Sequence, residues 1–231
     1  MRAPISIVIP TLNAGAELPE TLAALTEGLS DGLVRDLVIT DGGSSDDTRA
    51  IADAAGAIWV EGAPGRGGQL RRGCAAACGA WLLVLHADTH LSPGWARVVA
   101  QALRDPEHAH VFRLAFRTER PGAHVLPEWT AGWANLRTRA FGLAYGDQGV
   151  LMTRALYDTV GGYADIPLME DVALMRVLPR RPRLMPAEAR TSAARYEAEG
   201  WLRRGTRNLW TFARYRAGVS PVRLARSYRK R

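Results

Sequence analysis

Residues 5–13 read ISIVIPTLN, and this stretch decides how the rest of the chain is interpreted. Its first six residues are apolar with the exception of Ser6, and such a run is typical of a strand buried on both faces of a parallel sheet. Polar residues follow at once, because Thr11 and Asn13 stand where this strand would end. We therefore expect a buried strand over Ile5–Pro10 that carries polar side chains at its carboxyl end.

The same pattern recurs through the first half of the chain. Short apolar runs alternate with segments of helical character: strands are expected over Leu37–Asp41, Ala57–Val60 and Trp81–Ala87, and helices over Ala14–Leu29, Ile51–Ala54, Arg71–Ala80 and Pro93–Leu103. Ser44 or Ser45 is a natural N-cap for the second helix. This alternation predicts an α/β fold, with a mostly parallel sheet flanked by helices.

The second half is less regular, and it ends in a basic helical segment. Strands are expected over His110–Phe116 and Gly149–Met152, and helices over Glu128–Phe141, Arg154–Val160 and Glu170–Leu178. The segment Trp201–Arg216 sets its apolar side chains among arginines, namely Leu202, Leu209, Phe212 and Tyr215. This amphipathic pattern suits either packing on the domain, which we favour, or contact with a membrane surface.

Composition narrows the class of protein. With 231 residues, 47% of them hydrophobic and 23% charged, the chain can bury a substantial core and has no signature of disorder. Cys74 and Cys78 lack the partners of a zinc set, so we expect free thiols. Met1 leads directly into an apolar strand without a signal-like region, and no apolar run is long enough to span a bilayer, so a cytoplasmic protein is expected.

The formal charge of +7 is unevenly placed. Residues 176–231 carry +13, whereas residues 1–175 carry −6. A basic tail of this kind can meet phosphate on a nucleotide, a lipid head group or a nucleic acid. The alternative is a compositional bias, because Lys230 is the only lysine and every other basic residue is arginine.

Polar residues stand at the ends of three predicted strands. Thr11 and Asn13 follow the first, Asp41 opens the sequence DGGSSD after the second, and His86 and Asp88 end the fourth. Ligands of open α/β sheets bind beyond the carboxyl ends of the strands, so these side chains are expected to converge on one site.

Asp41 and Asp88 each allow two interpretations, one structural and one as a ligand-binding residue. Asp41 precedes two glycines and is either a turn former or, as we favour, an acceptor for a nucleobase or ribose. Asp88 follows a continuous apolar strand, where a carboxylate is costly unless it meets a cation. A phosphate-bound Mg²⁺ or Mn²⁺ is the expected partner, because the helix at Pro93 begins too far downstream for Asp88 to cap it.

Residues 62–69 read GAPGRGGQ and precede a helix. Free backbone amides and the charge of Arg66 suit a phosphate group there. The stretch matches neither a P-loop nor a dinucleotide fingerprint, and an ordinary loop is an equal alternative.

Together these motifs resemble the family 2 glycosyltransferases, which have the GT-A (Rossmann-like) fold. The residues that carry the resemblance are IVIPTLN at 7–13, DGGSSD at 41–46 and HAD at 86–88. The sequence is similar in particular to a subgroup of arsenosugar-biosynthesis-type glycosyltransferases, through GRG at 65–67, LHADT at 85–89, YGDQG at 145–149 and PLMED at 167–171. The resemblance extends from Ile5 to Tyr228.

The resemblance implies roles for the residues of the first half. Residues expected to bind the nucleotide are Pro10, Thr11 and Asn13 in the pocket, Asp41 at the nucleobase, and Arg66 near the ribose or diphosphate. Asp88 matches the last acid of the family's Asp-X-Asp metal motif. His86 stands in place of the first acid, and we expect it to touch the metal or the ribose.

The resemblance also implies roles in the second half. Asp171 matches the usual catalytic base and Glu170 its acidic neighbour, although an acidic pair at a helix start is the alternative reading. Asp147 and Gln148 would shape the acceptor pocket, or else form a Gly-flanked turn. Arg195 would close over the diphosphate, although the subgroup often has a second arginine at the position of Ala194.

The function implied is inverting transfer of a sugar from a nucleotide-diphosphate donor, with a UDP-sugar favoured, to an unknown acceptor hydroxyl. One domain is expected over residues 1–231, with a nucleotide-binding half (1–105), an acceptor half (106–200) and a basic helical tail (201–231). The tail is expected either to pack on the domain or to touch an anionic membrane at its inner face. No nucleic acid is expected as a partner.

Two other functions remain open. A sugar-nucleotide pyrophosphorylase would share the strand-end pocket, but that class carries a Gly-rich, lysine-bearing loop directly after the first strand, and residues 10–13 contain neither residue. A binder of nucleic acid or anionic membrane would depend on the arginine-rich tail, which lacks a recognisable nucleic-acid-reading module.

Overall fold

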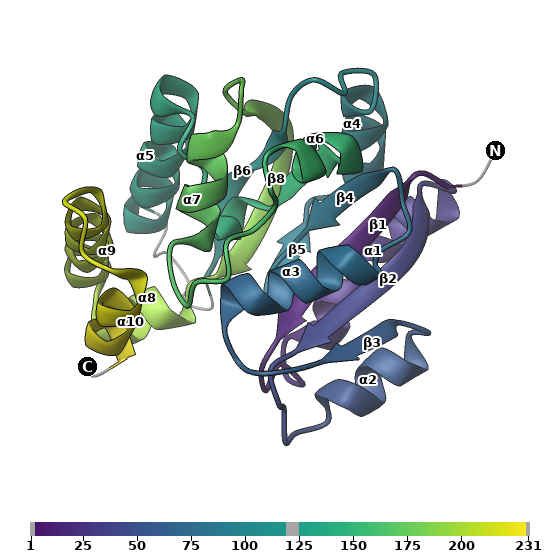
Figure 1. Ribbon diagram of the computed structural model, residues 1–231, viewed down its shortest axis with the longest axis horizontal. Coiled ribbons are helices and arrows are strands. Elements are labelled where there is room, and N and C mark those ends of the chain that lie inside the picture. The colour runs from purple at the N-terminus through teal and green to yellow at the C-terminus, as the bar shows by residue number, and fades with distance from the viewer. Residues whose placement is uncertain (1–2, 119–124, 230–231) are drawn as a thin grey trace.

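The computed structural model describes residues 3–118 and 125–229, and its centre is an eight-stranded sheet in the order β3-β2-β1-β4-β7-β6-β8-β5 (Figure 1). The strands are β1 (Ile5–Thr11), β2 (Val34–Asp41), β3 (Ile58–Glu61), β4 (Trp81–Val84), β5 (Thr89–Leu91), β6 (His110–Arg117), β7 (Val150–Thr153) and β8 (Arg183–Ser192). The sheet therefore joins strands from both halves of the chain.

Helices cover both faces of this sheet (Figure 1). They are α1 (Leu18–Ser30), α2 (Thr48–Ala54), α3 (Arg66–Ala76), α4 (Trp95–Ala102), α5 (Val125–Phe141), α6 (Arg154–Thr159), α7 (Glu170–Val177), α8 (Ala194–Glu199), α9 (Trp201–Arg216) and α10 (Pro221–Arg229). A 3-10 turn spans Gly146–Gln148.

The first strand explains why two layers of helix form. Ile5, Ile7 and Ile9 belong to the core under α1 and α4, whereas Val8 belongs to the core under α3, α6 and α7. All four side chains are at most 1% exposed. The apolar run at residues 5–9 thus supplies both cores by the two-residue alternation of a strand.

The α/β prediction is confirmed, and the sheet is parallel in its first part. β1 pairs in parallel with β2 and β4, and β2 pairs in parallel with β3. β7 runs antiparallel to both β4 and β6, and β5 runs antiparallel to β8. Strands β5 and β8 were not among the predicted strands.

Several predicted boundaries were wrong. Neither Ser44 nor Ser45 caps α2, which begins at Thr48 after Asp47, because both serines bind the loop that follows β1. Helix α3 begins at Arg66, five residues before the predicted start. Among the described residues both cysteines have free thiols, with Cys74 buried and Cys78 exposed. In the described part of the chain, no helix combines the length and apolar character needed to cross a bilayer.

The prediction that the apolar residues of α9 pack on the domain holds for only part of the helix. Phe212 and Tyr215 are half-buried, whereas Leu202 is 69% and Leu209 is 60% exposed. These two leucines lie on the side of α9 that faces away from the protein.

Helix α3 approaches the segment before α7 so closely that a side chain at Gly67 has no room. A Cβ atom at Gly67 would lie 2.2 Å from the carbonyl oxygen of Ala164. We expect Gly67→Ala to lower the free energy of unfolding by about 1–3 kcal/mol, because backbone atoms must shift. Gly205→Ala is the matched control, since a Cβ there meets no atom within 4 Å. Chemical denaturation measures both variants, and equal stability of the two would contradict this expectation.

Candidate active site

The predicted convergence of strand ends is present. β1, β2 and β4 lie side by side in parallel, so their carboxyl ends share one edge of the sheet. Thr11 and Asp41 are register partners at the ends of β1 and β2, and the Thr11 hydroxyl donates a hydrogen bond of 2.8 Å to the Asp41 carboxylate. The first two predicted motifs are therefore in contact.

The carboxylate of Asp41 is buried and is hydrogen-bonded by Thr11 and by its own loop. Its carboxylate accepts hydrogen bonds from the Thr11 hydroxyl, the Gly43 amide, and both the amide and the hydroxyl of Ser44. Burial raises the pKa of Asp41, but these four bonds outweigh it and hold the pKa below its ordinary value. Asp41 is therefore ionised at neutral pH and shapes the loop, and its contact with a nucleobase stays a prediction.

Asn13 fixes the loop after β1 against the loop after β2. Its backbone amide donates to the Ser44 hydroxyl at 2.8 Å, and its side-chain oxygen accepts from the Ser45 amide at 2.9 Å. The backbone of Asn13 has a φ of 51°, a left-handed conformation that Asn tolerates better than most residues. Pro10, at the end of β1, is half-buried beside this loop.

Gln69 links these loops, although it was not among the predicted site residues. Its side-chain nitrogen donates to the carbonyls of Thr11 (2.7 Å) and Thr40 (3.0 Å), and its side-chain oxygen accepts from the Gly65 amide (3.2 Å). A Cβ at Gly42 would lie 3.1 Å from the Gln69 side chain. The only signal in the sequence is a polar residue at the start of a helix, which does not reveal contacts so distant along the chain.

Backbone amides of the glycine-rich segment make hydrogen bonds within the protein, which was not predicted. The amide of Gly67 donates to the carbonyl of Ile166 at 3.2 Å, and the amide of Gly65 is taken by Gln69. These two amides are therefore not free for phosphate, and the prediction of free amides was wrong for them. The Nε of Arg66 lies 3.6 Å from the buried carboxylate of Glu170, and its place near a ribose or diphosphate stays a prediction.

His86 and Asp171 meet at the backbone of Gly146. A Cβ at Gly146 would lie 2.6 Å from His86 Nε2 and 3.6 Å from Asp171 Oδ2, and the Gly146 amide donates to Asp171 Oδ2 at 2.7 Å. Burial, together with the charges of Arg66 and Arg195, lowers the pKa of His86 well below its ordinary value. The imidazole is therefore neutral, which is the form that binds metals.

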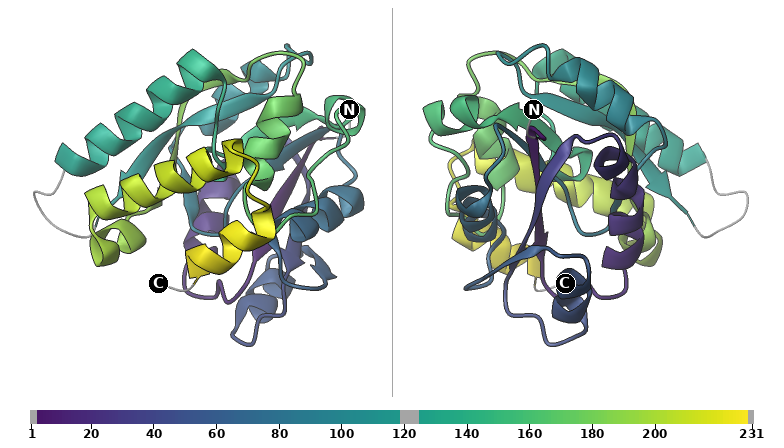
Figure 2. Two further views of the ribbon diagram at one scale, coloured as in Figure 1. Left: turned by 60° about the vertical axis from the view of Figure 1, so that its left-hand side comes forward. Right: turned by 90° about the vertical axis from the view of Figure 1, so that its right-hand side faces the viewer.

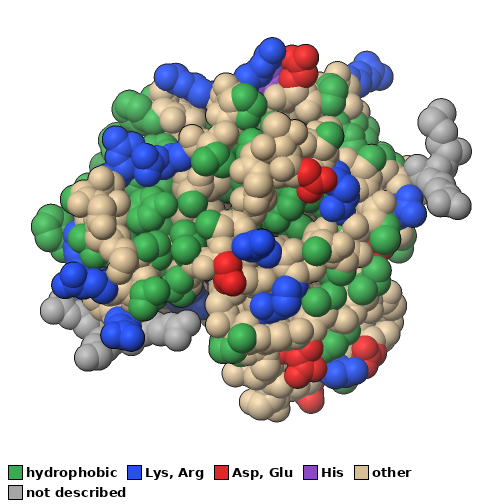
Figure 3. Space-filling view, in the orientation of Figure 1, with side chains coloured by type: hydrophobic (Ala, Val, Ile, Leu, Met, Phe, Trp, Pro, Cys, Tyr) green, Lys and Arg blue, Asp and Glu red, His purple; other side chains and the backbone are tan. Residues whose placement is uncertain are grey.

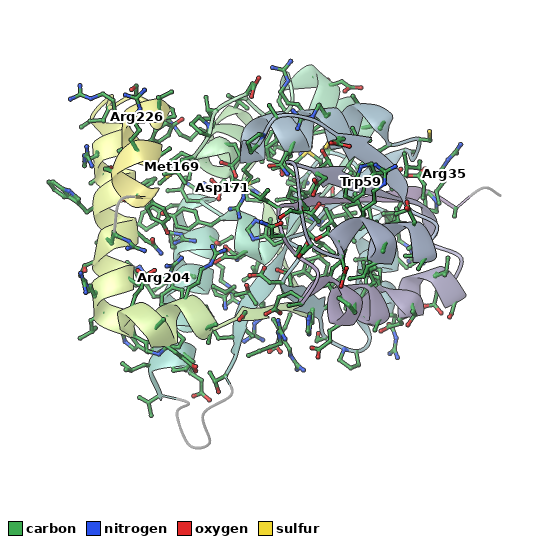
Figure 4. All side chains as sticks on the ribbon, turned by 90° about the horizontal axis from the view of Figure 1, so that it is seen from below. Arg35, Trp59, Met169, Asp171, Arg204 and Arg226 are labelled. Carbon is green, nitrogen blue, oxygen red and sulfur yellow. The ribbon has the colours of Figure 1, made fainter. Side chains whose placement is uncertain are left out.

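Asp171 is the second residue of α7 and follows a strained residue by two positions. Met169 has a φ of 70°, which is unusual for a residue other than glycine, and strain of this kind is concentrated at functional sites. Figure 4 shows Asp171 in the middle of the molecule, between the C-terminal helices and the N-terminal half. The two acids of the predicted pair, Glu170 and Asp171, thus lie next to the strand-end site and are not simply exposed to solvent.

Asp147 carries a strongly perturbed carboxyl group in the acceptor half. Burial raises its pKa to about 6; Arg137 opposes this effect, whereas the charges of Asp171 and Asp88 add to it. Its Oδ1 is buried and has no hydrogen-bond partner within the described structure. An unpartnered buried oxygen is costly unless a ligand or ion meets it, so Asp147 is suited to bind one.

Gln148 is placed differently from the prediction. Its side chain is fully buried, where its nitrogen donates to the carbonyl of Phe112 at 3.1 Å and its oxygen accepts from the Thr138 hydroxyl at 2.8 Å. The side chain joins α5 to β6 and does not line the acceptor side of the site.

Asp88 is held by Arg117, a second residue that the sequence analysis missed. The guanidinium of Arg117, at the end of β6, donates to the backbone carbonyl of Asp88 at 3.0 Å and also binds Glu17. The Asp88 carboxylate is half-buried and affects the pKa of Asp147, as described above. Arg195 lies at the start of α8, exposed but near enough to influence His86.

A cluster of aromatic residues lies near Asp147, whose charge raises the pKa of Tyr196 in addition to the effect of burial. Tyr196 stacks on Trp201 with ring centroids 4.8 Å apart, and Phe116 contacts both rings edge-on at 5.0 Å. The guanidinium of Arg137 lies 3.6 Å over the ring of Tyr145.

The buried acid Glu170 makes the stability of the protein depend on pH. Burial and the charge of Asp171 raise its pKa from an ordinary value of 4.5 to about 7, while Arg66 opposes them. The folded state therefore binds this proton more tightly than the unfolded state, and its stabilising effect is lost as the pH rises from about 4.5 through about 7.

We expect Glu170→Gln to gain on the order of 2 kcal/mol of stability over the wild type near pH 8, and nothing near pH 5. Urea denaturation at the two pH values measures the difference. Glu61→Gln is the matched control, because Glu61 is an exposed acid paired with Arg49 at 3.7 Å. A gain of the same size at both pH values would contradict the expectation.

The site offers few protein ligands for a metal ion. Within residues 3–118 and 125–229, no group of three or more His, Cys, Asp or Glu side chains could hold a metal ion. A divalent cation there would need phosphate oxygens to complete its coordination. The carboxylate of Asp88, the neutral ring of His86 and the unpartnered oxygen of Asp147 are donors of the right kind, so the residues fit an ion that arrives with a diphosphate.

Comparison with known proteins identifies the family of the chain. The model of the family Glycosyl transferase family 2 matches residues 6–153, which is more than half of the chain. Glucosyl-3-phosphoglycerate synthase of Mycobacterium tuberculosis is 38% identical over 93 residues, which cover 36% of this chain and 28% of that enzyme. The match thus spans less than a third of the length of this curated relative.

Solved structures share the architecture. Glucosyl-3-phosphoglycerate synthase from M. tuberculosis in complex with Mg²⁺ and UDP has a TM-score of 0.57 at 21% identity, covering 82% of this chain and 69% of that chain. The same enzyme in complex with Mn²⁺ and UDP-glucose has a TM-score of 0.55 at 22% identity, with the same coverage. At this identity the likeness shows the fold, and it confirms the predicted GT-A type.

Proposed function

This chain belongs to glycosyl transferase family 2, and from that premise we propose that it is an inverting glycosyltransferase with a UDP-sugar donor. The observation that supports this best is the meeting of Asp171 and His86 at Gly146. It sets a carboxylate beside a strand-end site that contains Asp88 and Arg66. Inverting transfer needs a base on one side of the sugar and a site for diphosphate on the other.

In the proposed reaction, the acceptor oxygen forms a bond to the anomeric carbon while the bond from that carbon to the diphosphate oxygen breaks. Asp171 takes the proton of the acceptor hydroxyl, and the electron pair of the broken bond leaves with the nucleoside diphosphate. Arg66 and Arg195 stabilise the charge that develops on the leaving group. Asp88 and His86 would hold Mg²⁺ or Mn²⁺, which when bound adds positive charge at the diphosphate.

UDP-glucose is the donor we propose, because a protein of the same fold was solved with UDP-glucose and Mn²⁺. The nucleotide would lie over Pro10, Thr11 and Asn13, and the ionised Asp41 keeps the second loop in the shape that receives it. The acceptor would enter between Asp147 and the aromatic group of Tyr196 and Trp201.

The experiment that tests this function uses the full chain with Mn²⁺ and UDP-glucose, GDP-glucose or ADP-glucose. We expect UDP-glucose to raise the melting temperature most and to be cleaved slowly to UDP, and NMR of a transfer product to show an inverted anomeric carbon. Formation of UDP-glucose and pyrophosphate from UTP and glucose 1-phosphate would instead identify a pyrophosphorylase. Absence of any nucleotide effect would overturn the proposal.

A further inference from the structure

Helix α9 buries two polar side chains against the protein and exposes three large apolar side chains to solvent. Arg204 and Thr211 are its buried residues, and Arg204 pairs with Glu199 at 2.6 Å. Leu202, Leu209 and Trp210 are exposed by 60–69%. A surface helix normally directs its apolar stripe at the core, so the stripe of α9 is available for another contact.

Helix α5 shows the same arrangement. Its buried residues are small or polar, namely Pro127, Ala131, Ala134 and Thr138. Its exposed large apolar residues are Val125, Leu126, Trp129, Trp133, Leu136 and Phe141, which are 45–78% exposed. Five of these, all but Phe141, recur at the spacing of a single helix face, so α5 also presents a continuous apolar stripe outward.

The two stripes form one surface. Helices α5 and α9 are in contact and lie side by side at the front of the left-hand view in Figure 2. Figure 3 shows hydrophobic side chains gathered over this part of the molecule, with arginines among them. We call it the outer helical surface, and it consists of the exposed apolar residues of α5 and α9 given above together with Val222 of α10. Scattered apolar residues are ordinary on a protein surface, but a contiguous group marks an interaction site.

Arginines border this surface. Arg139 of α5, Arg203 and Arg216 of α9, and Arg223 and Arg226 of α10 are exposed. Glu128 is the only acid in the sequences of the three helices. On α9, a hollow of about 300 Å³ is lined by Arg203, Thr206, Arg207 and Trp210. A guanidinium beside an indole suits a phosphate group at the boundary between water and lipid.

We propose that the outer helical surface binds the interface of an anionic lipid membrane. The apolar stripes with tryptophans would enter the head-group region, and the bordering arginines would meet lipid phosphates. A second copy of the chain fits less well, because a two-fold contact would bring the same arginine-bordered surface onto itself with almost no acid to pair.

The surface adjoins the acceptor side of the site. The ring of Tyr145, just before Gly146, lies 6.5 Å from that of Phe212 on α9. Membrane binding would therefore place the acceptor side of the site next to the lipid surface. The proposal does not depend on sugar transfer, since it concerns residues outside the catalytic site.

Flotation with vesicles tests the proposal. The full chain should float with vesicles of phosphatidylglycerol and phosphatidylcholine, bind at least about tenfold more weakly to phosphatidylcholine alone, and be released by high salt. The double variant Trp129→Ser/Trp210→Ser and the charge reversal Arg203→Glu/Arg216→Glu should each weaken binding about tenfold or more.

The controls lie on the opposite part of the molecule. Leu29→Ser on α1 and Arg97→Glu on α4 change exposed residues of the same kinds and should leave binding unchanged. Melting temperature and UDP binding verify that every variant is folded. Failure of the wild type to float at low salt would overturn the proposal. A dimer in sedimentation that the tryptophan variant dissolves, without vesicle binding, would assign the surface to self-association instead.

Discussion

Asp171→Asn should reduce the kcat for sugar transfer by about a hundredfold to ten-thousandfold while leaving nucleotide binding unchanged. Among the described residues the carboxylate accepts one long-range hydrogen bond, from the Gly146 amide at 2.7 Å, and an Asn oxygen can accept the same bond. The side chain thus keeps its place but loses the ability to take a proton at neutral pH. Single-turnover transfer and UDP titration measure the two effects separately.

Two further variants make the assignment of the base specific. Asp158→Asn removes an exposed carboxylate from α6 and should have no effect on kcat. Asp147→Asn removes the other carboxyl group near the acceptor side, whose pKa is raised to about 6. If Asp147→Asn abolished transfer and Asp171→Asn did not, the base would be Asp147.

Much of the fold follows from local patterns in the sequence. The apolar run at residues 5–9 supplies both cores, and such a run is visible without any knowledge of tertiary contacts. Strand β8 was missed because its inward-facing residues are mostly small: Met185, Ala187, Ala189 and Thr191 are buried, while Pro186, Glu188 and Arg190 lie between them. A strand of low intrinsic propensity is recognised only through its partners β6 and β5.

The candidate site also contains some residues that local sequence patterns predict and others that they do not. Thr11, Asp41 and Asp88 follow strands, and parallel strands necessarily bring their ends together, so the sequence predicts that they converge. Gln69 and Arg117 act through backbone carbonyls 58 and 29 residues away, and no local pattern encodes such contacts. The inward turn of Gln148 was missed for the same reason, because its partners lie on α5 and β6.

Asp88→Ala should abolish the stabilisation of the protein by UDP with Mn²⁺. For the wild type, ligand at a hundredfold excess over its Kd should raise the melting temperature by roughly 5–10 °C. Within the described residues no three protein ligands surround a metal, so removal of one carboxylate leaves too few donors to hold an ion with the diphosphate. The melting shift with and without EDTA measures the effect.

The variant His86→Asp tests the second predicted metal ligand. It restores an acid at the position where the family motif has one, and it replaces a neutral ring by a charged oxygen donor, which Mg²⁺ and Mn²⁺ prefer. We therefore expect His86→Asp to shift the metal titration to lower Mn²⁺ concentration and the double variant with Asp88→Ala to regain part of the melting shift. If Asp88→Ala alone retained the full Mn²⁺-dependent shift, the ion would be held elsewhere, and Asp147, with its unpartnered oxygen, would be the residue to test next.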